Sequence, residues 1–522
     1  SLLVNQEVMS LSFNENVNSI LPIVENYTSW EVPYVRYAQL NDIPSKHRSL
    51  TPALLMQEGV NTVVAESAVY NYPGMYLERH DKNIVGNWAK YPKETVMGSW
   101  GDFVSVVKER EDHIAVLPGK GNLPWRVFIS TDRDAELLNN SLIYLLNYEK
   151  NELPVHYDWV KPGRAVWEWW HDALLTDQKI PSGMENRSTQ LYNYYVDFAA
   201  RHQFEYMMID AGWSNVYDIQ KPNPKIDMTE VIQRAKDQNV EVLLWCVASS
   251  LMKDLSGNLD YIRSLGARGI KVDFFDRDDQ QAVIDMELIA KEAAKRQLVV
   301  NFHGCTKPSG WDYKYPNVLN YEAVRGEECS KWDTSSDPDY HALIPFIRML
   351  AGRLDYTAGS MRNRTKEDFK PVDPGLPMTM GTKAHELSLF VTFQHPLVML
   401  SDSPDEYEKY PEALAFLRAT PTSFDETRVL GGKIGEYTLM AKRSGEKWIL
   451  GGTNNWKGRE ITVNFDFLEP KKGYTLRILR DHAEDTNQVI SETRQVKRDS
   501  KLNFTMKEGG GLVMVIEPEI KK

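Results

Sequence analysis

The sequence predicts an α/β protein built on a (β/α)₈ TIM barrel, with a β-domain on either side of it. Between residues 164 and 400, short apolar runs alternate with helical patterns, and this span of 237 residues is close to the roughly 250 of a typical barrel. Most of the runs are continuously apolar, as expected of parallel strands that are buried on both faces. The flanking stretches lack this rhythm, which predicts domains over 1–155, 156–420 and 421–522.

Eight segments are the predicted barrel strands. In chain order they are Arg164–Trp170, Tyr206–Trp213, Val240–Val247, Gly269–Phe275, Leu298–Cys305, Asn317–Gly326, Leu354–Gly359 and Leu397–Leu400. An open doubly wound sheet is the alternative arrangement for such alternating elements. No Gly-rich phosphate-binding sequence follows the first strand, which favours the barrel.

Three of the intervening helices carry recognisable signals. Asp227, with Glu230 three residues later, has the pattern of a capped helix start. The helix over Leu259–Leu265 is expected to end at Gly266, which suits the left-handed position after a helix. In Ala282–Arg296 the apolar residues recur at helical spacing.

Strand patterns dominate both flanks. Asn61–Val69 and Ile114–Leu117 belong to an N-terminal region with Pro and Gly between alternating segments, which predicts antiparallel β-structure. In the C-terminal region a turn at Ser444-Gly445 separates two strand-like segments, and Leu512–Glu517 is a last strand. A C-terminal β-sandwich fits this pattern.

The composition narrows the function. The net charge of −12 argues against nucleic acid as a partner, and no apolar run is long enough to insert into a membrane. The chain has three cysteines, an odd number without the spacing of a metal-binding motif, which argues against a disulfide scaffold. Fourteen Trp and 25 Tyr supply flat amphipathic faces that suit both cores and sugar rings. The chain starts at Ser1 without a signal-peptide pattern, so the residues themselves leave the compartment open.

Ionisable side chains gather where the predicted strands end, which is where these barrels place their active sites. Asp273 ends the fourth strand, and Lys271 points to the same face and would keep Asp273 ionised. Glu328 follows the sixth strand and would need a raised pKa to protonate a leaving group. A glycosidase needs such a pair, and the distance between the two carboxyls, which chain spacing does not give, decides between retention and inversion. The alternative for each carboxylate is a solvated surface group.

Five further residues at strand ends are expected to line a sugar pocket through stacking and hydrogen bonds. They are Trp170, His171, Asp210, Lys271 and His303. For His303 a core histidine bonded to the backbone is an equal alternative.

The chain resembles glycoside hydrolase family 97. The matching strings include VKPGRAVWEWWH, FAARHQFEYMMIDAGW, GIKVDFFDRDD and NYEAVRGEE, and the likeness extends from about Pro52 to Lys331. The resemblance implies a (β/α)₈ barrel between an N-terminal β-super-sandwich and a C-terminal β-domain. The family's N-terminal domain is longer than the 150 residues present here, so its first strands are expected to be absent from this chain.

The family has an inverting α-glucosidase branch and a retaining α-galactosidase branch. In the retaining branch the nucleophile is the Asp that falls on Asp273, and the acid/base falls on Glu328. The inverting branch carries a glutamate where this chain has Gly304. The resemblance therefore implies a retaining exo-α-galactosidase that acts on α-galactoside oligosaccharides by double displacement. An inverting α-glucosidase of the same family is the nearest alternative, and a non-catalytic sugar-binding protein is the alternative from another class.

The resemblance also implies a calcium ion (Ca²⁺) at the catalytic centre. The family's ligands fall on Glu66, Glu322 and Glu328, and calcium prefers such oxygen donors. Gly304 removes one carboxylate that the inverting branch supplies. The resemblance further implies that the protein is periplasmic or otherwise exported. We also expect a monomer or a weak homo-oligomer.

Overall fold

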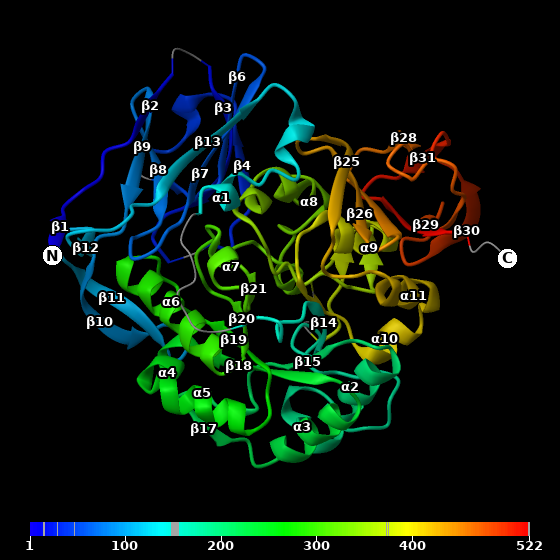
Figure 1. Cartoon of the computed structure of the whole chain (residues 1–522), viewed down its shortest axis with the longest axis horizontal. Helices are drawn as coiled ribbons and strands as arrows, with labels where there is room; N and C mark the ends of the chain where they lie inside the picture. The colour runs from blue at the N-terminus through cyan, green and yellow to red at the C-terminus, as the bar shows by residue number, and fades with distance from the viewer. Residues whose placement is uncertain are drawn as a thin grey trace.

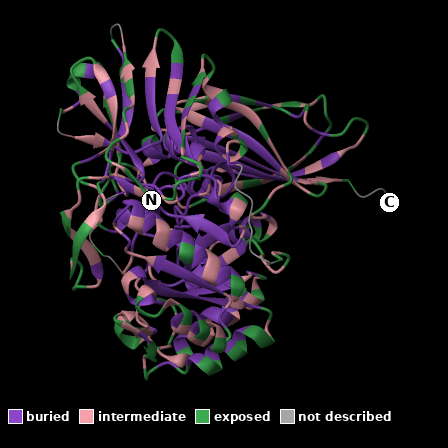
Figure 2. Ribbon diagram, turned by 60° about the vertical axis from the view of Figure 1, so that its left-hand side comes forward, coloured by how far each residue is buried: buried purple, intermediate pink, exposed green. Residues whose placement is uncertain are grey.

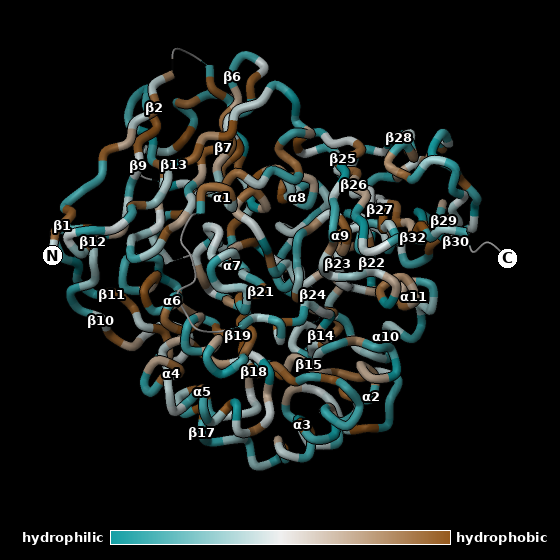
Figure 3. Tube along the Cα trace, viewed as in Figure 1, coloured by the Kyte–Doolittle hydropathy of each residue, from teal (hydrophilic) through white to brown (hydrophobic). Residues whose placement is uncertain are grey.

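The computed structural model describes residues 1–13, 16–28, 30–45, 47–147, 156–371, 373 and 375–519. The predicted domain boundary after residue 155 adjoins the stretch 148–155, which lies outside the described residues. In Figure 1 the N-terminal strands lie at the upper left, the barrel in the centre and the C-terminal strands at the right. Buried residues concentrate on the strands between these parts (Figure 2), and hydrophilic residues on the outer loops (Figure 3).

The N-terminal region is built from antiparallel strands. Its main sheet has nine strands, in the order β13-β7-β6-β3-β5-β8-β9-β2 with β4 beside β3. Their bounds are β2 (Ser10–Ser12), β3 (Asn18–Val24), β4 (Tyr34–Tyr37), β5 (Arg48–Ser49), β6 (Ala53–Gln57), β7 (Val60–Ser67), β8 (Met75–His80), β9 (Asn83–Trp88) and β13 (Trp125–Thr131). A separate hairpin of β10 (Pro92–Gly98) and β11 (Val104–Arg110) and a pair of β1 (Leu2–Val4) and β12 (Ala115–Leu117) complete it.

Seven parallel strands form the central sheet, in the order β21-β20-β19-β18-β15-β14-β24. Their bounds are β14 (Gly163–Trp167), β15 (Tyr206–Ile209), β18 (Glu241–Val247), β19 (Gly269–Asp273), β20 (Val299–Phe302), β21 (Val318–Tyr321) and β24 (Leu397–Leu400). Each of these strands is buried along its whole length or at all but one residue, as the continuous apolar runs predicted. The barrel prediction is confirmed.

The seventh predicted strand, over 354–359, is not a regular strand, and this corrects the prediction. Leu354 N donates to Gln394 O at 2.9 Å, and Asp355 N donates to Tyr321 O at 2.8 Å. The segment therefore lies between β21 and the approach to β24, where a seventh strand would close the barrel. Thr357 has φ +64°, which takes the backbone out of the extended region and ends the ladder.

Helices surround the sheet, and their predicted signals are confirmed. The longer ones are α2 (Thr189–Arg201), α3 (Met228–Asp237), α5 (Leu255–Ser264), α6 (Gln280–Lys295), α9 (Lys383–Thr392) and α11 (Pro411–Ala419). Asp227 caps α3 by accepting a hydrogen bond from Glu230 N at 3.0 Å, and Gly266 follows α5 with φ +97°. The helix predicted over 282–296 is α6, which begins two residues earlier. Among the described residues, no helix is both long and apolar enough to cross a membrane.

The C-terminal region consists of antiparallel sheets that pack on α9. Six strands have the order β25-β26-β27-β32-β29-β30, and β28 pairs with β31. Their bounds are β25 (Glu426–Lys433), β26 (Tyr437–Ser444), β27 (Lys447–Asn454), β28 (Arg459–Asn464), β29 (Tyr474–Asp481), β30 (Val489–Val496), β31 (Lys501–Met506) and β32 (Gly511–Pro518). Every residue of α9 is buried, because this barrel helix lies between two hydrophobic layers. Cys246, Cys305 and Cys329 are free and buried, so the expectation of no disulfide scaffold holds.

Candidate active site

Asp273 lies at the end of β19, and two neutral donors orient its carboxylate. Phe274 N donates to Oδ1 at 2.7 Å, and Trp245 Nε1, from the neighbouring strand β18, donates to Oδ2 at 3.0 Å. Each oxygen thus has a fixed position while the side chain remains half-buried. A carboxylate that is oriented in this way at a barrel-strand end is a candidate for chemistry on a bound ligand.

The backbone after Asp273 turns sharply against Gly304. Phe274 has φ +61° and Gly304 has φ +48°. A Cβ at position 304 would lie 2.7 Å from Phe274 N and 3.0 Å from Asp273 Oδ1. Gly304 O also accepts a hydrogen bond from Asp276 N at 2.8 Å. Position 304 therefore has no room for a side chain while Asp273 holds this conformation.

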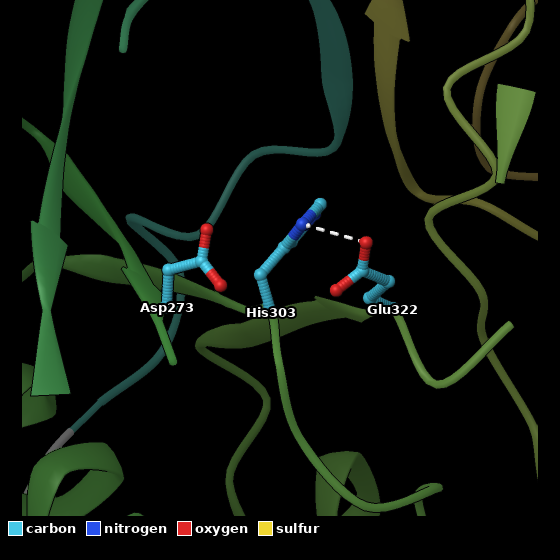
Figure 4. A group of neighbouring side chains, drawn as sticks. All are labelled: Asp273, His303 and Glu322. Carbon is cyan, nitrogen blue, oxygen red and sulfur yellow. Dashed lines mark ion pairs between the residues drawn. The ribbon is translucent and has the colours of Figure 1, made fainter. Parts of the chain in front are cut away.

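His303 links the strand ends through two carboxylates. Its Nε2 lies 2.5 Å from Asp355 Oδ2, and its Nδ1 lies 3.3 Å from Glu322 Oε1. Burial opposes protonation, but the two carboxylates raise the pKa of His303 well above its usual value. Figure 4 shows Asp273, His303 and Glu322 side by side, with the His303–Glu322 ion pair dashed. Both ring nitrogens face acids, so His303 is not the backbone-bonded core histidine of the alternative prediction.

Three glutamates from distant parts of the chain meet beside this group, and we call them the acidic triad. One carboxylate oxygen each from Glu31, Glu322 and Glu328 lies within 4.8 Å of the others. Burial, and then the charge of Glu322, raise the pKa of Glu31 well above its usual value. Burial, and then the charge of Glu31, raise the pKa of Glu328 to about 8. Glu322 is fixed by Gly304 N, which donates to its Oε2 at 2.8 Å.

Lys271 and Asp210 form a buried ion pair below the mouth of the barrel. Lys271 Nζ lies 2.9 Å from Asp210 Oδ2, which also accepts a hydrogen bond from Trp167 Nε1 at 2.8 Å. Burial works against ionisation of Asp210, but the charge of Lys271 and the hydrogen bonds from Ala211 N and Trp167 together lower the pKa of Asp210. Burial opposes the charge on Lys271, but the charges of Asp210 and then Asp273 raise its pKa; Lys271 thus pairs with Asp210 and also interacts with the charge of Asp273.

Two residues predicted to line the pocket are packed inside the fold. Trp170 has no exposed surface, and its Nε1 donates to Glu327 O at 3.3 Å. The ring of His171 lies between Ser401 O, at 2.8 Å, and Tyr195 OH, at 2.7 Å. Burial lowers the pKa of His171 to about 4. Both side chains are buried, as Asp210, Lys271 and His303 are, and their role in lining the pocket stays a prediction.

Glu66 does not meet the other predicted metal ligands. Its Oε2 accepts from Arg126 Nη1 at 2.8 Å, and its Oε1 accepts from Met75 N at 2.9 Å and pairs with Lys307. Burial opposes ionisation, but Lys307 and Arg126 together lower the pKa of Glu66. Both oxygens are committed to protein cations, and Glu31 takes the predicted place of Glu66 beside Glu322 and Glu328.

Sequence reasoning missed three residues of this site. Glu31 comes from the N-terminal region, and nothing in its local sequence distinguishes it from a surface glutamate. Asp355 is the second residue of the seventh predicted strand, Leu354–Gly359, so a rule that weighs the carboxyl ends of strands does not select it. Trp245 lies within an apolar strand. Because alternate residues of a strand point to the same face, Trp245 and Val247 share a face, and this alternation is the only sequence signal for the contact of Trp245 with the site.

The comparisons with known proteins agree with this architecture. The family model described as "Glycoside hydrolase 97" matches residues 169–324. The models "Glycosyl-hydrolase 97 N-terminal" and "Glycosyl-hydrolase 97 C-terminal, oligomerisation" match residues 1–148 and 423–517. A "Retaining alpha-galactosidase" of Bacteroides thetaiotaomicron is 34% identical over 98% of this chain and 79% of the relative. A "Probable retaining alpha-galactosidase" of Streptomyces bingchenggensis is 30% identical over 68% of this chain and 53% of the relative.

Solved structures share the fold. A family 97 enzyme of Pseudoalteromonas sp. strain K8, in complex with acarbose, superposes with a TM-score of 0.85 at 23% identity, over 99% of this chain and 81% of the other. A β-arabinopyranosidase superposes with a TM-score of 0.79 at 23% identity, over 97% of this chain and 79% of the other. Fold, domain models and relatives together define the chain as a glycoside hydrolase. It belongs to glycoside hydrolase family 97.

The packing of Gly304 gives a direct test. Gly304→Ala is expected to destabilise the fold by roughly 1–3 kcal/mol through overpacking, in addition to about 1–2 kcal/mol from its left-handed backbone. It is also expected to lower kcat/KM, because the new methyl group displaces Phe274 and Asp273. The matched control is Gly445→Ala, at a similar φ of +59° with no atom within 4 Å of the added methyl. The control is expected to lose only about 1–2 kcal/mol from its left-handed backbone and no activity. Thermal unfolding and steady-state kinetics measure both; equal effects of the two substitutions would refute the packing argument.

Proposed function

We propose that the chain is a retaining exo-α-galactosidase in which Asp273 is the nucleophile and Glu328 the acid/base. The observation that carries the proposal is the oriented carboxylate of Asp273 at the end of β19, packed against Gly304. A retaining mechanism needs a carboxylate that can reach the anomeric carbon. The names of the two curated relatives support galactose as the sugar and retention as the outcome.

The proposed reaction has two displacements. An Asp273 oxygen attacks the anomeric carbon while Glu328 gives its proton to the departing glycosidic oxygen, so that a covalent galactosyl-enzyme forms with inverted configuration. Glu328 then takes a proton from water, which attacks the same carbon, releases Asp273 and restores the α configuration. Without a cation, burial and the charge of Glu31 raise the pKa of Glu328 to about 8, which favours the protonated acid that the first step needs; a cation bound beside it would lower this pKa. Lys271, Asp210 and His303 hold the floor of the site in position.

The acidic triad fits a calcium ion. Calcium binds oxygen ligands at about 2.3–2.6 Å, so two ligands of one ion lie no more than about 5 Å apart, and the triad meets this limit at 4.8 Å. The group of Asp273, His303 and Glu322 fits less well, because it includes a nitrogen donor. Glu31, Glu322 and Glu328 would hold the ion, with water completing its coordination. A bound calcium ion would supply positive charge that offsets the three carboxylates and polarises neighbouring oxygens.

Replacing each proposed catalytic residue distinguishes their roles. Asp273→Gly is expected to lower kcat by roughly 10³-fold or more while the fold persists by circular dichroism. Azide fills the space left by the carboxylate and attacks the same face, so this variant should form β-galactosyl azide from an aryl α-galactoside. Glu328→Ala retains the nucleophile, so azide attacks the galactosyl-enzyme and should yield α-galactosyl azide. Proton NMR identifies the two products; the same anomer from both variants would exclude the assignment.

The melting temperature of the protein, measured with and without calcium, tests calcium binding independently of turnover. Chelator-treated protein is expected to gain stability when calcium is added, by roughly 2.7 kcal/mol at a concentration 100-fold above Kd. Glu31→Gln should lose most of this gain, because it removes one of three anionic ligands. Glu66→Gln is the matched control: it should melt lower, since Lys307 and Arg126 lose their partner, yet keep the calcium-dependent rise. An unchanged calcium response in Glu31→Gln would remove Glu31 from the ligand set.

A further inference from the structure

A hairpin of the N-terminal region extends to the loops around the barrel mouth. Figure 1 shows β10 and β11 beside α6 and α4 (Ala248–Lys253). Its tip is fastened from the barrel side by Tyr217, whose hydroxyl donates to Gly101 O, and by Ser249, whose hydroxyl donates to Phe103 O. Arg277 Nη1, just beyond β19, donates to Ser105 Oγ at 3.2 Å. The hairpin is thus fixed to loops that follow β15, β18 and β19.

The turn of this hairpin holds an unusual backbone. Four successive residues have positive φ: Ser99 (+56°), Trp100 (+45°), Gly101 (+90°) and Asp102 (+64°). Only glycine adopts this region without a steric cost, and such conformations persist where surrounding contacts enforce them. The result is a tryptophan at the tip whose surface is 69% exposed.

An aromatic path connects this exposed indole to Asp273. The ring centroid of Trp100 lies 6.3 Å from that of Phe274, which directly follows Asp273. Phe103 packs edge-on against the other side of Phe274 at 5.1 Å, and Trp245 contacts Phe274 at 6.4 Å while it donates to Asp273. Trp100 therefore lies on the rim of the site, and its nearest aromatic neighbour is Phe274, the residue next to the proposed nucleophile.

We propose that Trp100 is a stacking platform for the sugar unit that lies beyond the hydrolysed galactose. This inference rests on the proposed function, since it takes Asp273 to mark the position of the reacting sugar. The indole of Trp100 is exposed beside the proposed site, and the flat apolar face of a pyranose ring can stack on such a ring. The fastened turn keeps the ring in place before the substrate arrives, which lowers the entropy cost of binding. The substrate class that this platform favours is an oligosaccharide rather than a galactoside with a small leaving group.

The test compares two substrates that differ only in the group beyond galactose. Melibiose carries a sugar there, whereas α-galactosyl fluoride carries a single atom. Trp100→Ala is expected to lower kcat/KM for melibiose roughly 5- to 20-fold, the range for loss of an aromatic contact, mostly through KM. The loss for the fluoride should be several-fold smaller. Trp100→Phe keeps a flat ring and should recover much of the melibiose activity.

A matched control separates the platform from the integrity of the hairpin. Val96 lies on β10 and is 42% exposed, and Val96→Ala is expected to leave both substrates unaffected. Equal losses for the two substrates in Trp100→Ala would mean that Trp100 only supports Phe274 and Asp273, and no loss for either would mean that it has no role; each result overturns the platform. Failure of the unaltered enzyme to hydrolyse α-galactosyl fluoride would instead overturn the proposed function.

Discussion

The close approach of Phe274 to Gly304 is the constraint on which the site depends. The chain can turn after Asp273 only because residue 304 has no side chain, with a hypothetical Cβ 2.7 Å from Phe274 N. This turn places the carboxylate of Asp273 between its two hydrogen-bond donors and sends Phe274 outward to the hairpin that carries Trp100. Two adjoining strand ends thus fix the proposed nucleophile and one wall of the entrance together.

Charge balance shapes the rest of the site. Beneath the mouth, two buried cations have carboxylate partners: Lys271 has Asp210, and His303 has Asp355. The acidic triad above is not balanced in this way. Of its three glutamates, only Glu322 has an ion-pair partner among the described residues, and that partner is His303. Clustered carboxylates without counter-charge are costly to keep ionised. A divalent cation in the triad, as we propose, resolves this imbalance, and the contribution of Glu31 couples the N-terminal region to the barrel.

The sequence was sufficient for the architecture and for part of the site. Continuous apolar runs predicted the parallel strands, and the cap at Asp227 and the glycine at 266 predicted helix ends, because these signals are local. The prediction of the seventh strand was wrong because the left-handed backbone conformation of Thr357 has no distinctive sequence signal. Trp170 and His171 lie beyond the end of β14, where the alternation of a strand no longer indicates the direction of a side chain. Glu31 was missed because its role arises only when the chain brings residues 31 and 322 together.

The stereochemistry of the first product tests the central claim most directly, because a covalent nucleophile such as Asp273 gives two inversions at one carbon, whereas direct attack by water gives one. Proton NMR of the hydrolysis of an aryl α-galactoside, recorded before mutarotation, distinguishes the anomers of the released galactose. We predict that α-galactose appears first and that the β-anomer accumulates only as the sugar equilibrates. Initial release of β-galactose would show a single displacement by water and would contradict the assignment of Asp273 as the nucleophile.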